Sequence, residues 1–146
     1  MDEEAEISLG PLKIWVLGRQ FPDHQDFWDG NWLNVTAKCV GVGSRVEVSG
    51  AFIHLTELKK WMEDLRGFYS KLEGSVELPV MEPTLTVKIT TRKSMTGRLK
   101  CEIGITGEYI AERHNYLLEI DQSYLPGLIS QLATVLRVYP IKGEMQ

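Results

Sequence analysis

The residues best suited to chemistry lie in one short stretch, Phe21–Val35, with the sequence FPDHQDFWDGNWLNV. Asp23, Asp26 and Asp29 are spaced three apart, and His24 lies between the first two. Carboxylates and imidazoles bind divalent cations and serve as general acids and bases. The stretch therefore raises three hypotheses: a metal-binding or catalytic loop, a structural turn, or a surface that binds another protein.

The spacing of these groups argues against a calcium-binding loop. An EF-hand needs oxygen ligands at alternate positions, a central glycine and a closing glutamate. Here the aspartates are three residues apart and no glutamate closes the stretch. We therefore predict no metal site. An enzyme that draws further metal ligands from elsewhere in the chain is the third-ranked alternative.

The same stretch is also typical of a structural turn. Phe21-Pro22-Asp23 begins a turn and Asp29-Gly30 is a common turn pair. In this interpretation the aspartates accept backbone N–H bonds, while Trp28 and Trp32 fold over the edge of the core. The structural and the partner-binding interpretations both remain open.

The other nucleophiles and bases show no catalytic pattern. Cys39 and Cys101 lie on the apolar side of alternating segments and lack a CxxC spacing, so we expect buried thiols. His54 lies at a strand-to-helix junction and His114 in a polar turn, and neither has a partner nearby in the sequence. We predict no catalytic residue and no cofactor.

Composition and charge narrow the class of protein. The 146 residues, 43% of them hydrophobic, indicate one domain over residues 1–146, with residues 1–8 as a disordered or extended tail. No apolar run reaches the length of a membrane span, and the first six residues, MDEEAE, have the wrong charge for a signal peptide. We expect a cytoplasmic protein with no membrane partner.

The net charge of −4 disfavours a nucleic-acid partner, which requires a basic surface. One stretch, Thr84–Lys100, is nonetheless basic, with Lys88, Arg98 and Lys100 on the outward side of predicted strands. It lacks exposed aromatic residues on which bases would stack. We therefore interpret it as the solvated face of a sheet, joined by a loop over residues 92–97.

Hydrophobic periodicity predicts the elements that position these residues. Alternating apolar residues indicate strands, and i, i+3, i+7 spacing indicates helices. One helix is predicted over His54–Leu72, with Thr56 as N-cap, Gly74 as stop, and Tyr69 on its buried face. The second begins at Ser123 and ends before Pro140. The predicted strands cover residues 12–17, 32–40, 44–53, 76–80, 84–90, 98–107 and 115–121.

Each predicted strand is apolar on one face only, which is typical of antiparallel sheets with one face covered. Two amphipathic helices are available as the cover. The predicted class is α+β: a single curved antiparallel sheet of about six to seven strands packed on two helices. The predicted order is β-β-β-α-β-β-β-β-α.

Two segments together resemble the WapI family of bacterial immunity proteins. The first is Trp28-Asp-Gly-Asn-Trp-Leu33 with the preceding Phe21-Pro-Asp23, and the second is LEIDQSYLPGLI, residues 118–129, with the closing Tyr139-Pro140. The resemblance covers nearly the whole chain. It implies a protein that binds the toxin domain of a secreted or wall-associated protein, often a nuclease, and blocks it in the producing cell.

An inhibitor of this kind needs no active site, and an acidic surface would complement a basic, RNA-cutting partner. The expected partner is therefore a cognate protein toxin domain. The candidate partner-binding residues are Asp23, His24, Asp26, Trp28 and Asp29. The runner-up is a small-molecule-binding or regulatory module that uses the open sheet face or a pocket between sheet and helices. The oligomeric state and strand order are left open.

Overall fold

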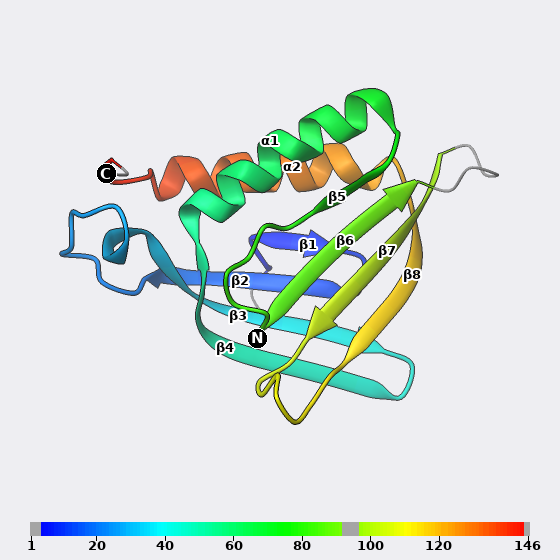
Figure 1. The fold of residues 1–146 in the computed structure, drawn as a ribbon, viewed down its shortest axis with the longest axis horizontal. Helices are drawn as coiled ribbons and strands as arrows, with labels where there is room; N and C mark the ends of the chain where they lie inside the picture. The colour runs from blue at the N-terminus through cyan, green and yellow to red at the C-terminus, as the bar shows by residue number, and fades with distance from the viewer. Residues whose placement is uncertain (1–3, 92–96, 145–146) are drawn as a thin grey trace.

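The computed structural model describes residues 4–91 and 97–144, which form two helices and two antiparallel four-stranded sheets (Figure 1). The first sheet contains β1 (Ile7–Leu9), β2 (Leu12–Arg19), β3 (Trp32–Gly41) and β4 (Ser44–His54) in that order. The second contains β5 (Ser75–Glu77), β6 (Leu85–Thr91), β7 (Arg98–Ile105) and β8 (Asn115–Asp121) in that order. Helix α1 (Leu55–Lys71) connects the sheets, and α2 (Tyr124–Val138) follows β8.

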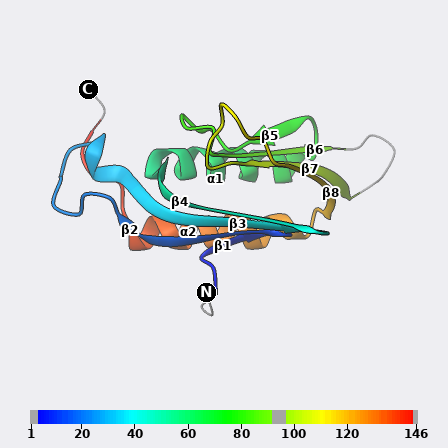
Figure 2. The same cartoon turned by 90° about the horizontal axis from the view of Figure 1, so that it is seen from below.

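The two sheets lie one above the other, with α1 level with the second sheet and α2 level with the first (Figure 2). Both helices run along one side of the sheets (Figure 1). The inward residues of β3, such as Leu33 and Val35, are buried in the same core cluster as those of β6, such as Val87 and Ile89. Ser44 Oγ and Tyr116 Oη lie 3.0 Å apart, which links the two sheets at one edge of the core.

The α+β class and the antiparallel strands are confirmed, but the single curved sheet and the three-strand opening of the predicted order are wrong. The chain begins with four strands, and its eight strands divide equally between two sheets within the described residues. A strand that is apolar on one face shows only that this face is covered. The cover can be a helix or another sheet, and in this protein the inward faces of both sheets lie in one core cluster with residues of both helices.

The additional strand, β1, lies partly in the predicted tail of residues 1–8. Ile7 and Leu9 are buried, and β1 pairs with β2 through a tight turn at Gly10, whose φ of 58° favours glycine. The outer edge of β1 is covered by α2, where Gln131 Oε1 accepts the Ser8 N–H at 2.9 Å. A three-residue strand is too short to show a clear alternating pattern in the sequence, which explains why it was missed.

The N-cap of helix α1 lies two residues before the predicted Thr56. His54 is the N-cap, and the Glu57 side chain accepts the His54 N–H at 2.8 Å, which completes a capping box. The helix ends at Lys71, and its C-cap is Leu72, in the left-handed conformation with φ 52°, ahead of the predicted stop at Gly74. Tyr69, expected on the buried face, is exposed.

Three further predictions concern the core and the loops. Cys39 and Cys101 are buried free thiols, as predicted, and burial raises their pKa values to about 11 and about 12. Ser123 occupies the N-cap position of α2, as predicted, but its side chain makes no capping hydrogen bond. The loop expected over residues 92–97 lies outside the described residues except for Gly97.

Within the described residues, no helix has the length and apolar character needed to cross a membrane.

Candidate functional site

The predicted site residues all lie in the segment Gln20–Asn31, which we call the recognition loop. It connects β2 to β3 and projects from one end of the molecule, closing with a short 3-10 helix, Asp29–Asn31 (Figure 1). Asp23, His24, Asp26, Trp28 and Asp29 are all exposed. The structure therefore brings these five side chains together on one surface loop.

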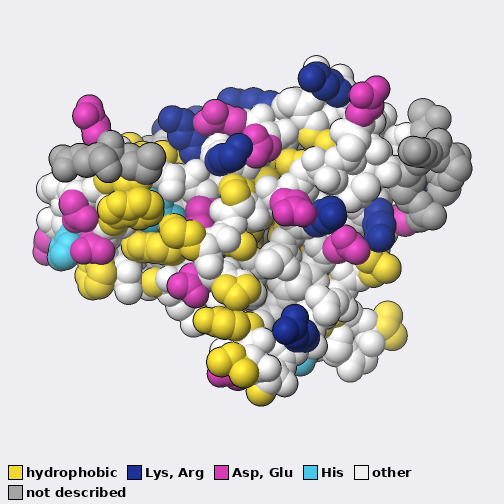
Figure 3. Space-filling model, viewed as in Figure 1, with side chains coloured by type: hydrophobic (Ala, Val, Ile, Leu, Met, Phe, Trp, Pro, Cys, Tyr) yellow, Lys and Arg dark blue, Asp and Glu magenta, His cyan; other side chains and the backbone are white. Residues whose placement is uncertain are grey.

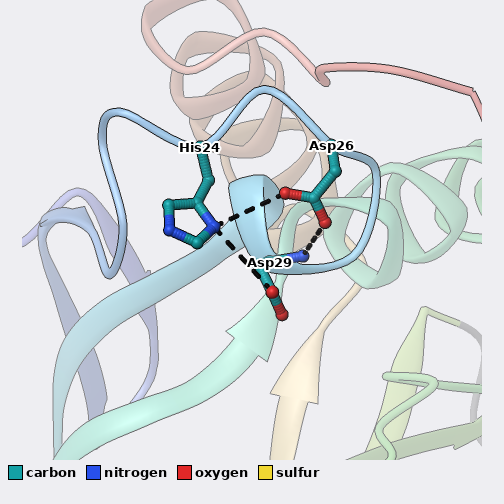
Figure 4. Close-up of side chains that lie close together, drawn as sticks. All are labelled: His24, Asp26 and Asp29. Atoms are coloured by element: carbon teal, nitrogen blue, oxygen red, sulfur yellow. Dashed lines mark hydrogen bonds and ion pairs between the residues drawn. The ribbon is translucent and has the colours of Figure 1, made fainter.

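His24, Asp26 and Asp29 form a compact cluster on this loop (Figure 4). His24 Nδ1 lies 3.6 Å from Asp26 Oδ1 and 3.8 Å from Asp29 Oδ2. Asp26 Oδ2 accepts the Asp29 N–H at 2.9 Å, and this bond lowers the pKa of the Asp26 carboxyl. The His24 ring also stacks on Phe21, with centroids 4.9 Å apart.

This geometry has two chemical interpretations. One ligand atom from each of the three residues falls within a group spanning 4.8 Å, which is compatible with a cation. The Asp26 carboxylate is, however, already a backbone acceptor in the turn, as the structural interpretation of the loop predicted. Both interpretations of the loop therefore agree with its geometry.

Asn31 fastens the recognition loop to the C-terminal segment. Its side chain is fully buried, and Nδ2 donates to the Phe27 carbonyl at 2.7 Å and to the Lys142 carbonyl at 2.9 Å. Its Oδ1 accepts the Lys142 N–H at 2.9 Å and Arg19 Nη1 at 3.2 Å. One amide therefore ties together the loop, the end of β2 and a segment 111 residues away in sequence.

Two cationic side chains, those of Lys142 and Arg19, hold the loop by donating hydrogen bonds to backbone carbonyls. Lys142 Nζ donates to the carbonyls of Pro22 at 2.8 Å and His24 at 3.0 Å. Arg19 donates to the Gly30 carbonyl at 2.7 Å and also to the Pro140 carbonyl. Sequence reasoning missed all three bracing residues, Arg19, Asn31 and Lys142, because no local pattern connects the two ends of the chain.

His54 joins the recognition loop to the start of α1. Its ring is fully buried, and Nε2 lies 3.1 Å from the Trp28 carbonyl while Nδ1 lies 2.6 Å from Thr56 Oγ1. A carbonyl can only accept, so Nε2 carries the proton in the neutral ring and Nδ1 accepts from Thr56. Burial lowers the pKa of His54, which favours this neutral form.

Three aromatic rings surround the His54 imidazole. Trp32, Trp28 and Phe27 lie with ring centroids 4.9, 5.6 and 5.7 Å from it. Trp32 is half-buried, consistent with the predicted clamp over the edge of the core, whereas Trp28 remains 49% exposed. Trp28 therefore has one side supported by the protein and another side open to solvent.

The basic side chains predicted on a sheet face lie on the outer face of the second sheet and are paired with acids. Among the described residues of this face, the ion pairs are Lys88–Glu77 at 3.7 Å, Arg98–Glu119 at 3.8 Å and Lys100–Glu102 at 3.4 Å. The described part of this face is thus a mixture of both charges. Such a face lacks the continuous positive potential that nucleic-acid binding requires.

The outer face of the second sheet also carries an open groove of about 750 Å³. One wall is the segment Leu78–Val80, and the floor includes Thr86, Gly104 and Leu117. Space for the groove exists partly because Gly104 has no side chain: a Cβ there would lie 2.5 Å from Thr86 Oγ1. This groove is the feature of the structure most suited to a small ligand.

The sequence and the fold were compared with those of known proteins. A search of curated proteins finds no match. A chain in the solved "Structure of the plant transcriptional regulator PBF-2" is similar in fold, with 14% sequence identity and a TM-score of 0.50 over 88% of this chain and 75% of that chain. The model of the "Immunity protein WapI-like family" matches residues 5–140. Because that match spans most of the sequence, the chain belongs to the WapI-like family of immunity proteins.

Proposed function

We propose that this protein is a non-catalytic immunity protein that binds a cognate bacterial toxin domain in the cytoplasm of the producing cell and neutralises it. Membership of the immunity-protein family supports a toxin-neutralising role. We assign the contact with the toxin to the recognition loop, through Asp23, His24, Asp26, Trp28 and Asp29. No cofactor is needed for this function, because inhibition requires only that a complex forms.

The observation that carries the assignment is the combination of an exposed Trp28 with a braced backbone. Asn31 and Lys142 hold the loop from the side of the protein, and His54 holds the Trp28 carbonyl. A loop that is already ordered loses little conformational entropy on binding. Tryptophan is also enriched among the residues that contribute most to binding energy.

The charge of the recognition loop favours a basic partner. Asp23, Asp26 and Asp29 are its only charged side chains apart from His24, and all are exposed. Complementary charge speeds encounter and determines specificity. A nuclease that binds RNA must carry a basic surface, so a nuclease toxin would satisfy this requirement.

The test is binding to the C-terminal domain encoded by the neighbouring reading frame, with protection of cells that express it. Replacing the three aspartates by Asn should weaken binding by about tenfold or more, mainly through slower association, and leave the melting temperature nearly unchanged. Trp28→Ala should weaken binding by a similar factor through faster dissociation.

The matched control replaces three exposed acids outside the loop, Glu47, Glu63 and Glu73, by Gln. This variant makes the same change in net charge, so equal weakening would show a general charge effect and remove the assignment to the loop. Absence of both binding and protection in the wild type would contradict the proposed function itself.

A small-molecule-binding module is the second candidate, and the groove on the second sheet is the observation that favours it. A screen of metabolites by thermal shift should then give a ligand whose stabilising effect disappears in Gly104→Val. The bulky side chain would meet Thr86 and fill the floor of the groove. A ligand shift that survives this substitution would place the site elsewhere.

A further inference from the structure

We propose that the docking surface for the toxin extends beyond the recognition loop to two other segments. The toxin surface that binds there is basic around an apolar centre. The segments are Leu78–Thr84, between β5 and β6, and Thr106–His114, between β7 and β8. Together with the recognition loop they form what we call the three-loop surface. This inference rests on the proposed function and specifies where the partner is held.

A buried carboxylate connects the first two parts of the surface. Glu57 Oε1 accepts the His54 N–H at 2.8 Å, and Glu57 Oε2 accepts the Met81 N–H at 2.7 Å. His54 in turn contacts the Trp28 carbonyl through Nε2. The backbones of Trp28 and Met81 are therefore both fastened to the start of α1, and both side chains are exposed.

The second and third parts are joined by a backbone hydrogen bond and a shared depression. The Thr106 N–H donates to the Thr84 carbonyl at 3.0 Å, and Pro83 and Tyr109 line the same hollow of about 160 Å³. Figure 3 shows hydrophobic side chains in groups from the recognition loop, past the area below α1, to the lower loops, with acidic side chains beside them. The three segments therefore share one face of the molecule.

The Thr106–His114 segment presents apolar side chains on an ordered turn, as the recognition loop does. Glu108 Oε1 accepts the Ile110 N–H at 2.7 Å, and the Glu108 carbonyl accepts the Glu112 N–H at 2.8 Å. Thr106 Oγ1 also accepts the Glu108 N–H at 3.1 Å. Ile110 projects from this turn with 85% of its surface exposed, and Tyr109 is exposed beside it. Such ordered apolar groups suit a protein partner.

Charge complementarity identifies the chemistry of that partner. The three segments contain six carboxylates and one arginine, whereas the rest of the chain contains 14 carboxylates and 15 Lys and Arg residues. The negative charge of the protein is thus concentrated on this surface. Two cations, Lys142 and Arg19, lie next to the recognition loop. Both donate to its backbone carbonyls, Lys142 to those of Pro22 and His24 and Arg19 to that of Gly30. A partner that covers the surface must supply positive charge around its apolar contacts.

The experiment measures affinity for the C-terminal domain encoded by the neighbouring reading frame, with Trp28→Ala, Met81→Ser and Ile110→Ser. The matched control is Val42→Ser, another aliphatic residue in an exposed turn, with a relative exposure of 108% and a place outside the three segments. We expect Ile110→Ser and Met81→Ser each to weaken binding by about fivefold or more, and Val42→Ser by less than about twofold. Unchanged melting temperatures would verify that each variant is folded.

The outcomes separate this inference from the proposed function. If Trp28→Ala weakens binding but Met81→Ser and Ile110→Ser behave like Val42→Ser, the extended surface is wrong and the recognition loop alone holds the toxin. If the wild type does not bind the domain, the proposed function fails and this inference fails with it. If light scattering shows that Ile110→Ser breaks up a dimer while toxin affinity is unchanged, the occupant is a second copy of this chain and the inference is overturned.

Discussion

The recognition loop and the outer face of the second sheet are both charged in the sequence, but the structure gives their charges different surroundings. On the sheet, Lys88 and Lys100 lie beside Glu77 and Glu102, so opposite charges alternate across the strands. In the loop, Asp26 and Asp29 both lie near one histidine, His24, with Oδ-to-Nδ1 distances of 3.6 and 3.8 Å. The loop therefore keeps a net negative charge that the sheet face does not have.

The two regions also differ in how their backbones are held. Strands of the sheet are fixed by continuous pairing, for example between Lys88 and Glu102, and their outward side chains contribute little to the fold. The recognition loop has no such pairing between Phe21 and Asn31 and depends on a few side-chain hydrogen bonds. The structural role of a charged cluster thus depends on its tertiary neighbours. Single substitutions should therefore change the free energy of unfolding by different amounts in the two regions.

The largest effect is expected for Asn31→Ala. The substitution leaves the Phe27 and Lys142 carbonyls and the Lys142 N–H without their buried partner, which should lower the free energy of unfolding by about 3 kcal/mol. Asn115→Ala, on the exposed sheet face, should change it by less than about 0.5 kcal/mol. Urea unfolding measures both, and equal losses would contradict the role of Asn31 as a brace.

The next largest effect is expected for His54→Asn. The substitution should lower the free energy of unfolding by about 2 kcal/mol at pH 7 and change how that free energy depends on pH. Burial lowers the pKa of His54 in the folded state, so the unfolded state binds more protons as the pH falls below about 6.5. The wild type should therefore lose stability between pH 7 and pH 5, and the variant should lose less.

The comparison of the two proteins isolates His54, because every other titrating group is common to both. Among these is Glu57, whose pKa is raised by burial and which acts in the opposite direction on acidification. Parallel curves of unfolding free energy against pH for wild type and His54→Asn would show that His54 is not held neutral by the fold.

Lys142→Met should have a smaller effect, about 1 kcal/mol. The substitution keeps the apolar stem but removes the bonds from Nζ to the Pro22 and His24 carbonyls. Hydrogen exchange at the amides of the recognition loop should accelerate, while exchange in β6 and β7 should not change. Lys13→Met, an exposed lysine on β2, is the control, and acceleration in both variants would argue against a specific brace.

The smallest effect is expected for Lys88→Gln on the sheet face. Its ion pair with Glu77 is 3.7 Å long and both side chains are largely exposed, so the free energy of unfolding should change by less than about 0.5 kcal/mol. Toxin affinity should also be unchanged, because the pair lies outside the three-loop surface. A loss as large as that of Lys142→Met would remove the distinction between the two regions.

Much of the local structure could be predicted from the sequence. The alternating positions of β3 and β7, including Cys39 and Cys101, are buried as expected, because side-chain direction in a strand depends only on a two-residue period. Both helices were also located, apart from small differences at their ends. The exposure of the five candidate site residues agrees with their polar, turn-rich surroundings in the sequence.

The division into two sheets could not be predicted, because periodicity shows which face of a strand is buried but not what buries it. The same limit applies to the β1 edge, where the cover is Gln131 of α2. The capping of α1 by His54 was missed for a related reason, since Asp, Asn, Ser and Thr are the residues that sequence rules favour at that position.

By itself, the sequence determined the types of the elements, their buried faces and the presence of an acidic, tryptophan-containing loop, since all of these follow from short-range patterns. Only packing of the chain placed Asn31 and Lys142 against this loop and acids beside the basic strand residues. It also brought Glu57 to the N–H groups of Met81 and of His54, the residue that holds the Trp28 carbonyl. The Lys88–Glu77, Glu57–Met81 and Asn31–Lys142 contacts join residues 11, 24 and 111 positions apart. Only packing of the whole chain brings such residues together, because the hydrogen bonds and ion pairs that link them act over a few ångströms in space whatever their separation in sequence.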